Sequence, residues 1–171
     1  MKRRTALMTT TVVLGLPWAT AATAAPALQG QQVQWPDVTL LDGRPLTAAQ
    51  LQDKPTLVVF WTTTCPFCRR HNQHLEKLHR AAQAAASPLR VLAVARERDA
   101  AVVKRYAQAQ GYTFDITLDH LPLAAALSER KMSPLTVWVD RHNRLQQVLP
   151  GEMFEEDVME FLQLASKGAR S

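Results

Sequence analysis

Cysteine is scarce in this chain: only 2 of its 171 residues are cysteines. Two cysteines cannot form a disulfide-rich scaffold, and a chain of this length can bury a core without one. Aromatic residues are also few, at 6%, while 47% of the residues are hydrophobic and 20% are charged. These proportions are typical of one globular domain and exclude a disordered, collagen-like or coiled-coil chain.

Acidic residues are absent before Asp37, whereas Lys2, Arg3 and Arg4 stand together at the amino terminus. The formal net charge of the whole chain is +5, which would suit an acidic partner. Removal of the first 24 residues would leave 17 basic and 15 acidic residues, a net charge of +2. The positive excess therefore belongs mainly to the amino terminus, and it does not support binding to nucleic acid.

Residues 1–24 have the pattern of a secretory signal peptide, with a basic start, an apolar middle and small residues at the end. Ala22-Thr23-Ala24 has the small-x-small pattern, so we expect cleavage after Ala24. The alternative is an uncleaved membrane anchor. Threonines, a glycine and a proline interrupt the apolar middle, which is shorter than the roughly 20 apolar residues that a transmembrane helix needs. We therefore predict export to the periplasm, outside the reducing cytosol.

One domain over residues 38–168 is predicted to follow a linker over residues 25–37. Two apolar runs, Thr56–Trp61 and Val91–Ala95, are typical of strands buried on both faces of a sheet. Periodicity and turn residues predict a hairpin over 38–46, further extended segments over 114–118, 136–139 and 144–149, and helices over 68–86, 100–110, 123–130 and 154–165. This order of strands and helices predicts an α/β fold with a mixed sheet.

The two cysteines form the sequence Cys65-Pro66-Phe67-Cys68, where a predicted strand ends and a predicted helix begins. A helix start supplies free N–H groups and a partial positive charge, which stabilise a thiolate. Cys65 is therefore predicted to be the attacking nucleophile, and Cys68, one turn inside the helix, to resolve the mixed disulfide. Residues at this spacing can close a disulfide without rearranging the fold. The motif predicts a redox-active cysteine pair.

Other uses of the two cysteines are less well supported. A structural disulfide across so short a loop would stabilise the protein little. A metal site needs about four ligands, and the chain offers only the two cysteines with His71 and His74 further along the predicted helix. The simpler interpretation is that His71 and His74 are exposed to solvent on the helix, so we predict no metal site. A copper carrier that uses both cysteines and a histidine is the alternative from another class of protein.

The surroundings of the cysteines resemble the thioredoxin superfamily. Val59–Cys68, with the sequence VFWTTTCPFC, is similar to its active-site strand and elbow. Leu41–Leu46 and the spacer to Lys54 resemble the opening of the exported TlpA/DsbE-like group. Ser133–Asp140, with the sequence SPLTVWVD, resembles the segment that holds a cis-proline before a hairpin strand. The resemblance covers about residues 38–165 and implies a thioredoxin-like three-layer α/β/α sandwich with an N-terminal β-hairpin extension.

The resemblance also implies which residues bind the substrate. Pro134 would be the cis-proline that faces the disulfide, and the backbone at Ser133 would pair with an extended substrate, as in β-augmentation. Pro66 and Phe67, between the two cysteines, would contact the same substrate.

Some positions depart from the family's pattern. Val59 replaces the buried aspartate that moves protons in thioredoxins proper. In TlpA-like proteins an acidic residue after the next strand is thought to assist instead. Glu97 stands close to that place and is the candidate proton relay, with Arg98 as the alternative match. Thr64 replaces a tryptophan before the first cysteine, and Leu135 replaces a threonine after the proline, so the identity of the partner is left open.

The chemistry expected of this chain is thiol–disulfide exchange with client proteins, without a bound cofactor. The resemblance implies a reductase, for example of cytochrome c apoproteins, that receives electrons from a membrane thiol transporter. The Pro-Phe dipeptide also occurs in oxidising or isomerising relatives, so a disulfide oxidase or isomerase is the alternative direction.

Overall fold

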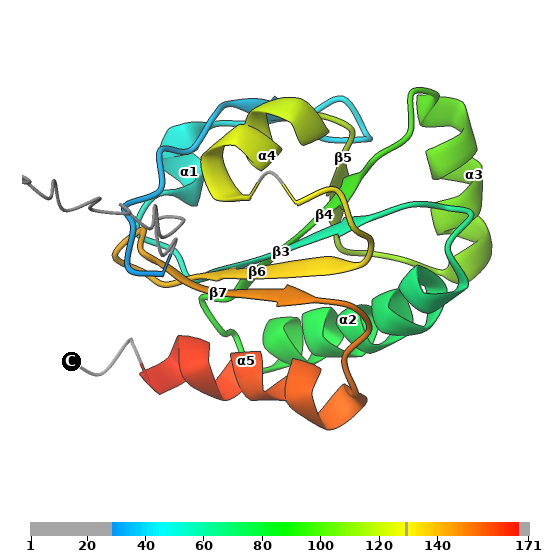
Figure 1. Ribbon diagram of the computed structural model, residues 1–171. Coiled ribbons are helices and arrows are strands. Elements are labelled where there is room, and N and C mark those ends of the chain that lie inside the picture. Colours follow the sequence, from blue (N-terminus) through cyan, green and yellow to red (C-terminus); the bar gives the residue numbers. More distant parts are fainter. Residues whose placement is uncertain (1–28, 129, 168–171) are drawn as a thin grey trace, which may run out of the picture.

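A computed structural model describes residues 29–128 and 130–167 of the chain (Figure 1). The predicted signal peptide, the start of the predicted linker and Gly168 lie outside the described residues. The strands are β1 Val38–Thr39, β2 Pro45–Leu46, β3 Thr56–Trp61, β4 Arg90–Ala95, β5 Asp115–Thr117, β6 Leu135–Val139 and β7 Leu145–Pro150. The helices are α1 Ala48–Leu51, α2 Pro66–Ala84, α3 Ala100–Gln110, α4 His120–Leu127 and α5 Glu155–Lys167.

Five strands form one mixed sheet in the order β5-β4-β3-β6-β7. β3 pairs in parallel with β4, and β4 with β5, whereas β6 pairs antiparallel with β3, and β7 with β6. The remaining two strands, β1 and β2, form a separate antiparallel hairpin. The structure therefore confirms the predicted mixed sheet and the N-terminal hairpin.

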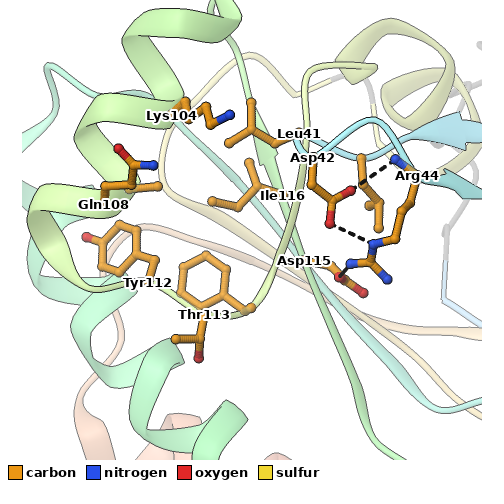
Figure 2. A pocket seen from close by; sticks show the side chains of 12 residues that line it. Leu41, Asp42, Arg44, Lys104, Gln108, Tyr112, Thr113, Asp115 and Ile116 are labelled. Atoms are coloured by element: carbon orange, nitrogen blue, oxygen red, sulfur yellow. Dashed lines mark hydrogen bonds and ion pairs between the residues drawn. The ribbon is translucent and has the colours of Figure 1, made fainter.

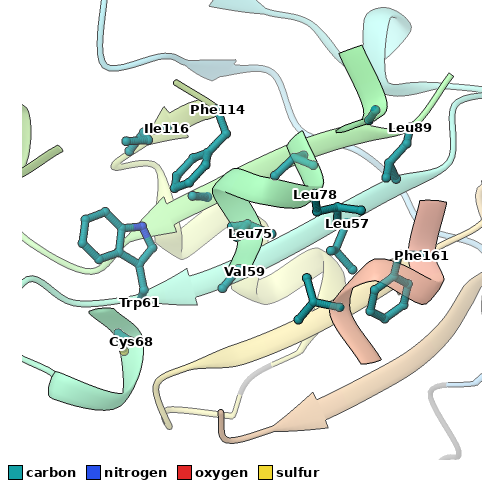
Figure 3. Close-up of a cluster of buried hydrophobic side chains, with 14 of the residues drawn as sticks. Leu57, Val59, Trp61, Cys68, Leu75, Leu78, Leu89, Phe114, Ile116 and Phe161 are labelled. Atoms are coloured by element: carbon teal, nitrogen blue, oxygen red, sulfur yellow. The ribbon is translucent and has the colours of Figure 1, made fainter. Parts of the chain in front are cut away.

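β3 is the central strand, and all six of its side chains are buried. Because successive side chains of a strand point to opposite faces, Leu57, Val59 and Trp61 pack in one cluster with residues of α2, α3 and α5 (Figure 3). Val58 and Phe60 pack in the other cluster, with residues of α1, α4 and the hairpin. The sheet is thus the middle layer of the predicted three-layer sandwich.

Two helices begin earlier than the sequence pattern predicted. α2 begins at Pro66 rather than Cys68, with Cys65 as its N-cap. Proline suits the first helical position because its fixed φ is already helical and its missing N–H would have no partner there. α4 begins at His120 rather than Leu123, because the first turn of a helix also tolerates Pro122. It ends at Leu127.

The described part of the predicted linker belongs to the packed domain. Val33 and Trp35 are buried in the same cluster as α4. The Trp35 indole N–H donates to Asn143 Oδ1 at 3.1 Å, and the Val33 N–H donates to the Asn143 carbonyl at 2.7 Å. Asn143, in the turn between β6 and β7, has a positive φ of 58°. The segment from residue 29 to 37 is therefore fixed to this turn and does not act as a free linker.

Glu76 on α2 is a buried carboxylate that joins α2 to the segment between α3 and β5. It accepts hydrogen bonds from the Thr113 N–H at 2.7 Å, from Thr113 Oγ1 at 2.6 Å and from Arg80 Nε at 2.6 Å. Burial by itself would raise the pKa of this carboxyl, but the bonds from Thr113 and Arg80 outweigh burial and lower the pKa below its usual value. This stabilisation is therefore complete above the ordinary carboxyl pKa and is lost as the pH falls through the lower folded-state pKa.

We expect Glu76→Ala to lower the free energy of unfolding by about 2–3 kcal/mol at neutral pH, because it leaves the Thr113 N–H without its buried acceptor. Urea unfolding monitored by circular dichroism would measure the loss. The difference in the free energy of unfolding between Glu76→Ala and the wild type should shrink as the pH is lowered below about 4. Glu160→Ala, at an exposed position of α5, should change stability by less than about 0.5 kcal/mol. A loss at Glu76 no larger than that of this control would contradict the prediction.

Candidate active site

Cys65 and Cys68 lie at the carboxyl end of β3, where the chain turns into α2. Cys65 is partly exposed, whereas Cys68 is fully buried at 0% exposure. Cys68 belongs to the same buried cluster as Trp61, which ends β3 (Figure 3). Both residues are free thiols in this structure. The geometry thus exposes one thiol for attack and keeps the second inside the protein.

The Cys65 sulfur lies between the first turn of α2 and the loop before β6. Its Sγ accepts a hydrogen bond from the Cys68 N–H at 3.2 Å and lies 3.7 Å from the carbonyl oxygen of Ser133. An N–H group at a helix start stabilises negative charge on such a sulfur. The arrangement suits a thiolate nucleophile at Cys65.

The Cys68 thiol holds its proton strongly. Burial raises the pKa of Cys68 to about 12, and its hydrogen bond with Cys65 adds to this increase. The negative charges of Cys65 and Glu97 raise it further, against a backbone hydrogen bond from Thr62 that lowers it. Cys68 is therefore protonated at neutral pH, and its reaction needs a group that removes the proton.

Glu97 follows β4, and its carboxylate points to the loop before Cys65. Its Oε1 accepts a hydrogen bond from the Thr63 N–H. Its Oε2 is buried and has no hydrogen-bond partner among the described residues. Arg98, the alternative match, is exposed. The structure thus brings Glu97, rather than Arg98, to the loop before Cys65.

The Ser133–Pro134 peptide bond is cis, as the resemblance implied. The Pro134 carbonyl accepts a hydrogen bond from the Gly151 N–H at 2.9 Å, which links this loop to the segment after β7. Because the Ser133 carbonyl lies beside Cys65, the structure brings together the cysteine pair and the loop that the sequence singled out.

Phe67 is 55% exposed beside the nucleophile. The Arg70 guanidinium lies over its ring at 5.0 Å from the ring centre and also makes two hydrogen bonds, of 2.7 and 2.6 Å, to the Glu152 carboxylate. Glu152 was not singled out from the sequence, because nothing in the local pattern links a loop residue after β7 to α2. An exposed aromatic ring next to Cys65 offers an apolar contact to a substrate.

His71 is buried at 0% exposure, so the expectation of a solvated histidine is wrong. Its Nε2 lies 3.0 Å from Thr136 Oγ1, and its Nδ1 accepts a hydrogen bond from the Met153 N–H at 3.2 Å. Burial lowers the pKa of His71 to about 4, so the ring is neutral at neutral pH. Both ring nitrogens are engaged, so a copper ion could bind His71 only by breaking one of these contacts.

The other histidine considered for copper, His74, has its Nδ1 3.4 Å from Glu155 Oε2. Across residues 29–128 and 130–167, no group of three or more His, Cys, Asp and Glu side chains is placed to hold a metal ion.

A hollow of about 210 Å³ lies between the hairpin, α3 and β5 (Figure 2). Arg44 lies at its edge, with ion pairs to Asp42 at 2.6 Å and to Asp115 at 3.3 Å. Neither cysteine lines it. This hollow is therefore separate from the reactive thiols.

A thioredoxin-like fold with a cysteine pair at the start of α2 and a cis-proline beside it defines the class of thiol–disulfide oxidoreductases. Residues 25–162 match the family model described as Redoxin, and the chain belongs to this family. Within the thioredoxin superfamily it is a TlpA/DsbE-like thiol–disulfide oxidoreductase.

The chain is similar to the thiol-disulfide oxidoreductase ResA of Halalkalibacterium halodurans, with 30% identity over 125 residues that cover 72% of this chain and 69% of the relative. In fold it is similar to a thiol:disulfide interchange protein of Chlorobium tepidum, with a TM-score of 0.69, 20% identity and coverage of 79% and 97% of the two chains. It is also similar to a structure described as a secreted thiol-disulfide isomerase of Corynebacterium glutamicum, with a TM-score of 0.68, 21% identity and coverage of 80% and 86%.

None of the helices in the described part of the chain has the length and apolar character required to span a membrane.

Proposed function

We propose that this protein is an exported reductase that transfers two electrons from the Cys65–Cys68 dithiol to disulfides of client proteins. The observation that carries this direction is the setting of the Cys65 sulfur, which accepts one hydrogen bond, from the Cys68 N–H, and has no hydrogen bond from a basic side chain among the described residues. Strong oxidants of this chemistry stabilise their reduced form. A nucleophilic thiolate with so few stabilising contacts makes the reduced form less favoured than in a strong oxidant, so the dithiol tends to give up electrons. The resemblance of the sequence to the TlpA/DsbE-like group implies the same direction.

The exchange proceeds through two substitutions at sulfur. The Cys65 thiolate attacks one sulfur of the client disulfide, which forms a mixed disulfide and releases the other client sulfur as a thiolate. Cys68 then loses its proton, attacks the Cys65 sulfur and releases the second client thiolate. The client gains two electrons and, with two protons, becomes a dithiol, while the protein is left with the Cys65–Cys68 disulfide. The reaction needs no bound cofactor.

The second substitution is the step that needs a base. Glu97 is proposed to take the Cys68 proton, because its free Oε2 is buried close enough for its charge to raise the pKa of Cys68. The client chain is proposed to lie against Pro66 and Phe67 on one side and Ser133 and Pro134 on the other, with its backbone paired at Ser133.

The setting of the reaction is proposed from the sequence and the relatives. The basic and apolar first 24 residues support export to the periplasm, as does the likeness to a structure described as secreted. A reductase in an oxidising compartment must be reduced again, so a membrane thiol transporter is the proposed electron donor. Cytochrome c apoproteins are the proposed clients, because their haem-binding thiols must be kept reduced.

The reduction potential of the Cys65–Cys68 couple tests this proposal. Purified mature protein would be equilibrated with defined thiol–disulfide buffers, and the oxidised fraction measured by alkylation and mass spectrometry. We expect a potential at or below about −220 mV. A value near about −120 mV would identify an oxidase or isomerase instead. Failure of the couple to equilibrate, together with retention of Cu(I), would identify the copper carrier.

A further inference from the structure

We infer that His71 is a positioning residue that holds the segments on both sides of Cys65, where the client is proposed to bind, in place. The inference rests on the client contact proposed at Ser133 and Pro134. It does not depend on whether the protein reduces or oxidises its client.

The hydrogen bonds of His71 define one tautomer of its ring. The Met153 N–H donates to Nδ1, so Nδ1 carries no proton. The neutral ring therefore has its proton on Nε2, which donates to Thr136 Oγ1 at 3.0 Å. His71 and Thr136 are both fully buried, so water cannot replace either partner. A buried imidazole is well tolerated only when both nitrogens are satisfied, as they are here.

The two partners of His71 belong to the two segments that border the nucleophile. Thr136 lies on β6, two residues after Pro134, and follows the loop whose Ser133 carbonyl faces Cys65. Met153 lies two residues after Gly151, whose N–H bonds to the Pro134 carbonyl. His71 itself stands on α2, three residues after Cys68. One side chain thus connects the cysteine helix, the cis-proline strand and the segment after β7.

A second contact joins two of these segments at the surface, where Arg70 on α2 bonds to Glu152. The exposed pair is open to solvent and ions, whereas the His71 contacts are not. The buried imidazole is therefore a link between α2 and the proposed client contact that solvent and ions do not weaken. The charged or titratable groups that act on it are His74, from α2, and Glu152, from the segment after β7.

The experiment compares His71→Leu with His74→Leu, the same substitution one turn further along α2. The substrate is a synthetic peptide with one internal disulfide, the protein is the purified mature chain, and a chemical dithiol in excess restores the Cys65–Cys68 dithiol after each turnover. We expect His71→Leu to raise KM for the peptide by about tenfold, the effect of losing roughly 1.4 kcal/mol of binding, with a much smaller change in kcat. His74→Leu should leave KM within about twofold of the wild type.

Two conservative variants separate the two hydrogen bonds. His71→Asn can place an acceptor near the position of Nδ1, and His71→Gln can place a donor near that of Nε2. Each should recover part of the lost affinity, and both remain informative if His71→Leu does not fold. Equal KM values for the Leu, Asn and Gln variants and the wild type would overturn the inference. A fall in kcat with KM unchanged would also overturn it.

Nitrogen-15 NMR of the wild-type imidazoles gives a readout that does not depend on exchange activity. We expect His71 to show a protonated Nε2 and an unprotonated Nδ1 from pH 8 to pH 5, without titration in that range. A ring that titrates near its ordinary value, or one with the proton on Nδ1, would contradict the inference. The reductase proposal stands or falls on the reduction potential, so failure of one proposal is distinguishable from failure of the other.

Discussion

Cys65→Ser is expected to reduce thiol–disulfide exchange to the uncatalysed rate, because it removes the only thiol that is both partly exposed and held at the start of α2. A serine hydroxyl at this position cannot attack a disulfide sulfur at neutral pH. Reduction of a model disulfide peptide, with a chemical dithiol as the electron source and the alkylated peptide measured by mass spectrometry, would show the loss.

Cys68→Ser is the matched variant, and it should behave differently. Cys65 would still attack the client, but no second thiol would release it, so the mixed disulfide should accumulate. Non-reducing gel electrophoresis and mass spectrometry of the captured peptide would show a one-to-one adduct through Cys65. If Cys65→Ser retained turnover, or Cys68→Ser captured no client, the assignment of nucleophile and resolving residue would be wrong.

Glu97→Gln is expected to slow the resolution of the mixed disulfide by about 10²-fold, within the range for loss of a general base. The amide can still accept the hydrogen bond from the Thr63 N–H, so the loop before Cys65 should keep its geometry. The attack by Cys65 should change little. Stopped-flow measurement with a peptide that reports attack and release separately would resolve the two steps.

Whether Glu97→Gln slows or speeds the release of the client distinguishes two roles of Glu97. Its negative charge helps to raise the pKa of Cys68, so removal of the charge lowers that pKa. If Glu97 acted only through its charge, Glu97→Gln would make Cys68 easier to deprotonate and would speed the release of the client. Slower release supports the proton relay, and faster release refutes it. Arg98→Gln, at the alternative matched position, serves as the control and should leave both steps unchanged.

The sequence predicted the elements that depend on local patterns. The apolar run from Thr56 to Trp61 forms β3 with the same bounds, since a strand buried on both faces needs no polar residue. Asp99 and Gly111 mark the two ends of α3 through side-chain capping and a positive φ, which are properties of the residues themselves. The redox-active cysteine pair was likewise predicted from local residues, the two cysteines and their spacing.

The features that the sequence did not predict depend on contacts between distant segments. His71 looks like a surface residue because polar positions surround it on α2. Only the approach of Thr136 and Met153 makes its burial favourable. Trp35 is a similar case, because its partner Asn143 lies 108 positions away along the chain. Local periodicity contains no information about such pairs.

The position of residues 29–37 in the fold determines where an amino-terminal attachment would lie relative to the reactive thiols. The segment near Val33 is bonded at the β6–β7 turn. Because β6 runs antiparallel to β3, this turn lies beside the start of β3, whereas the cysteines follow its end. An anchor or partner attached before residue 29 would therefore join the domain at the end opposite its thiols. The end of the domain that carries the cysteines would point away from that attachment, open to a client protein and then to the proposed electron donor.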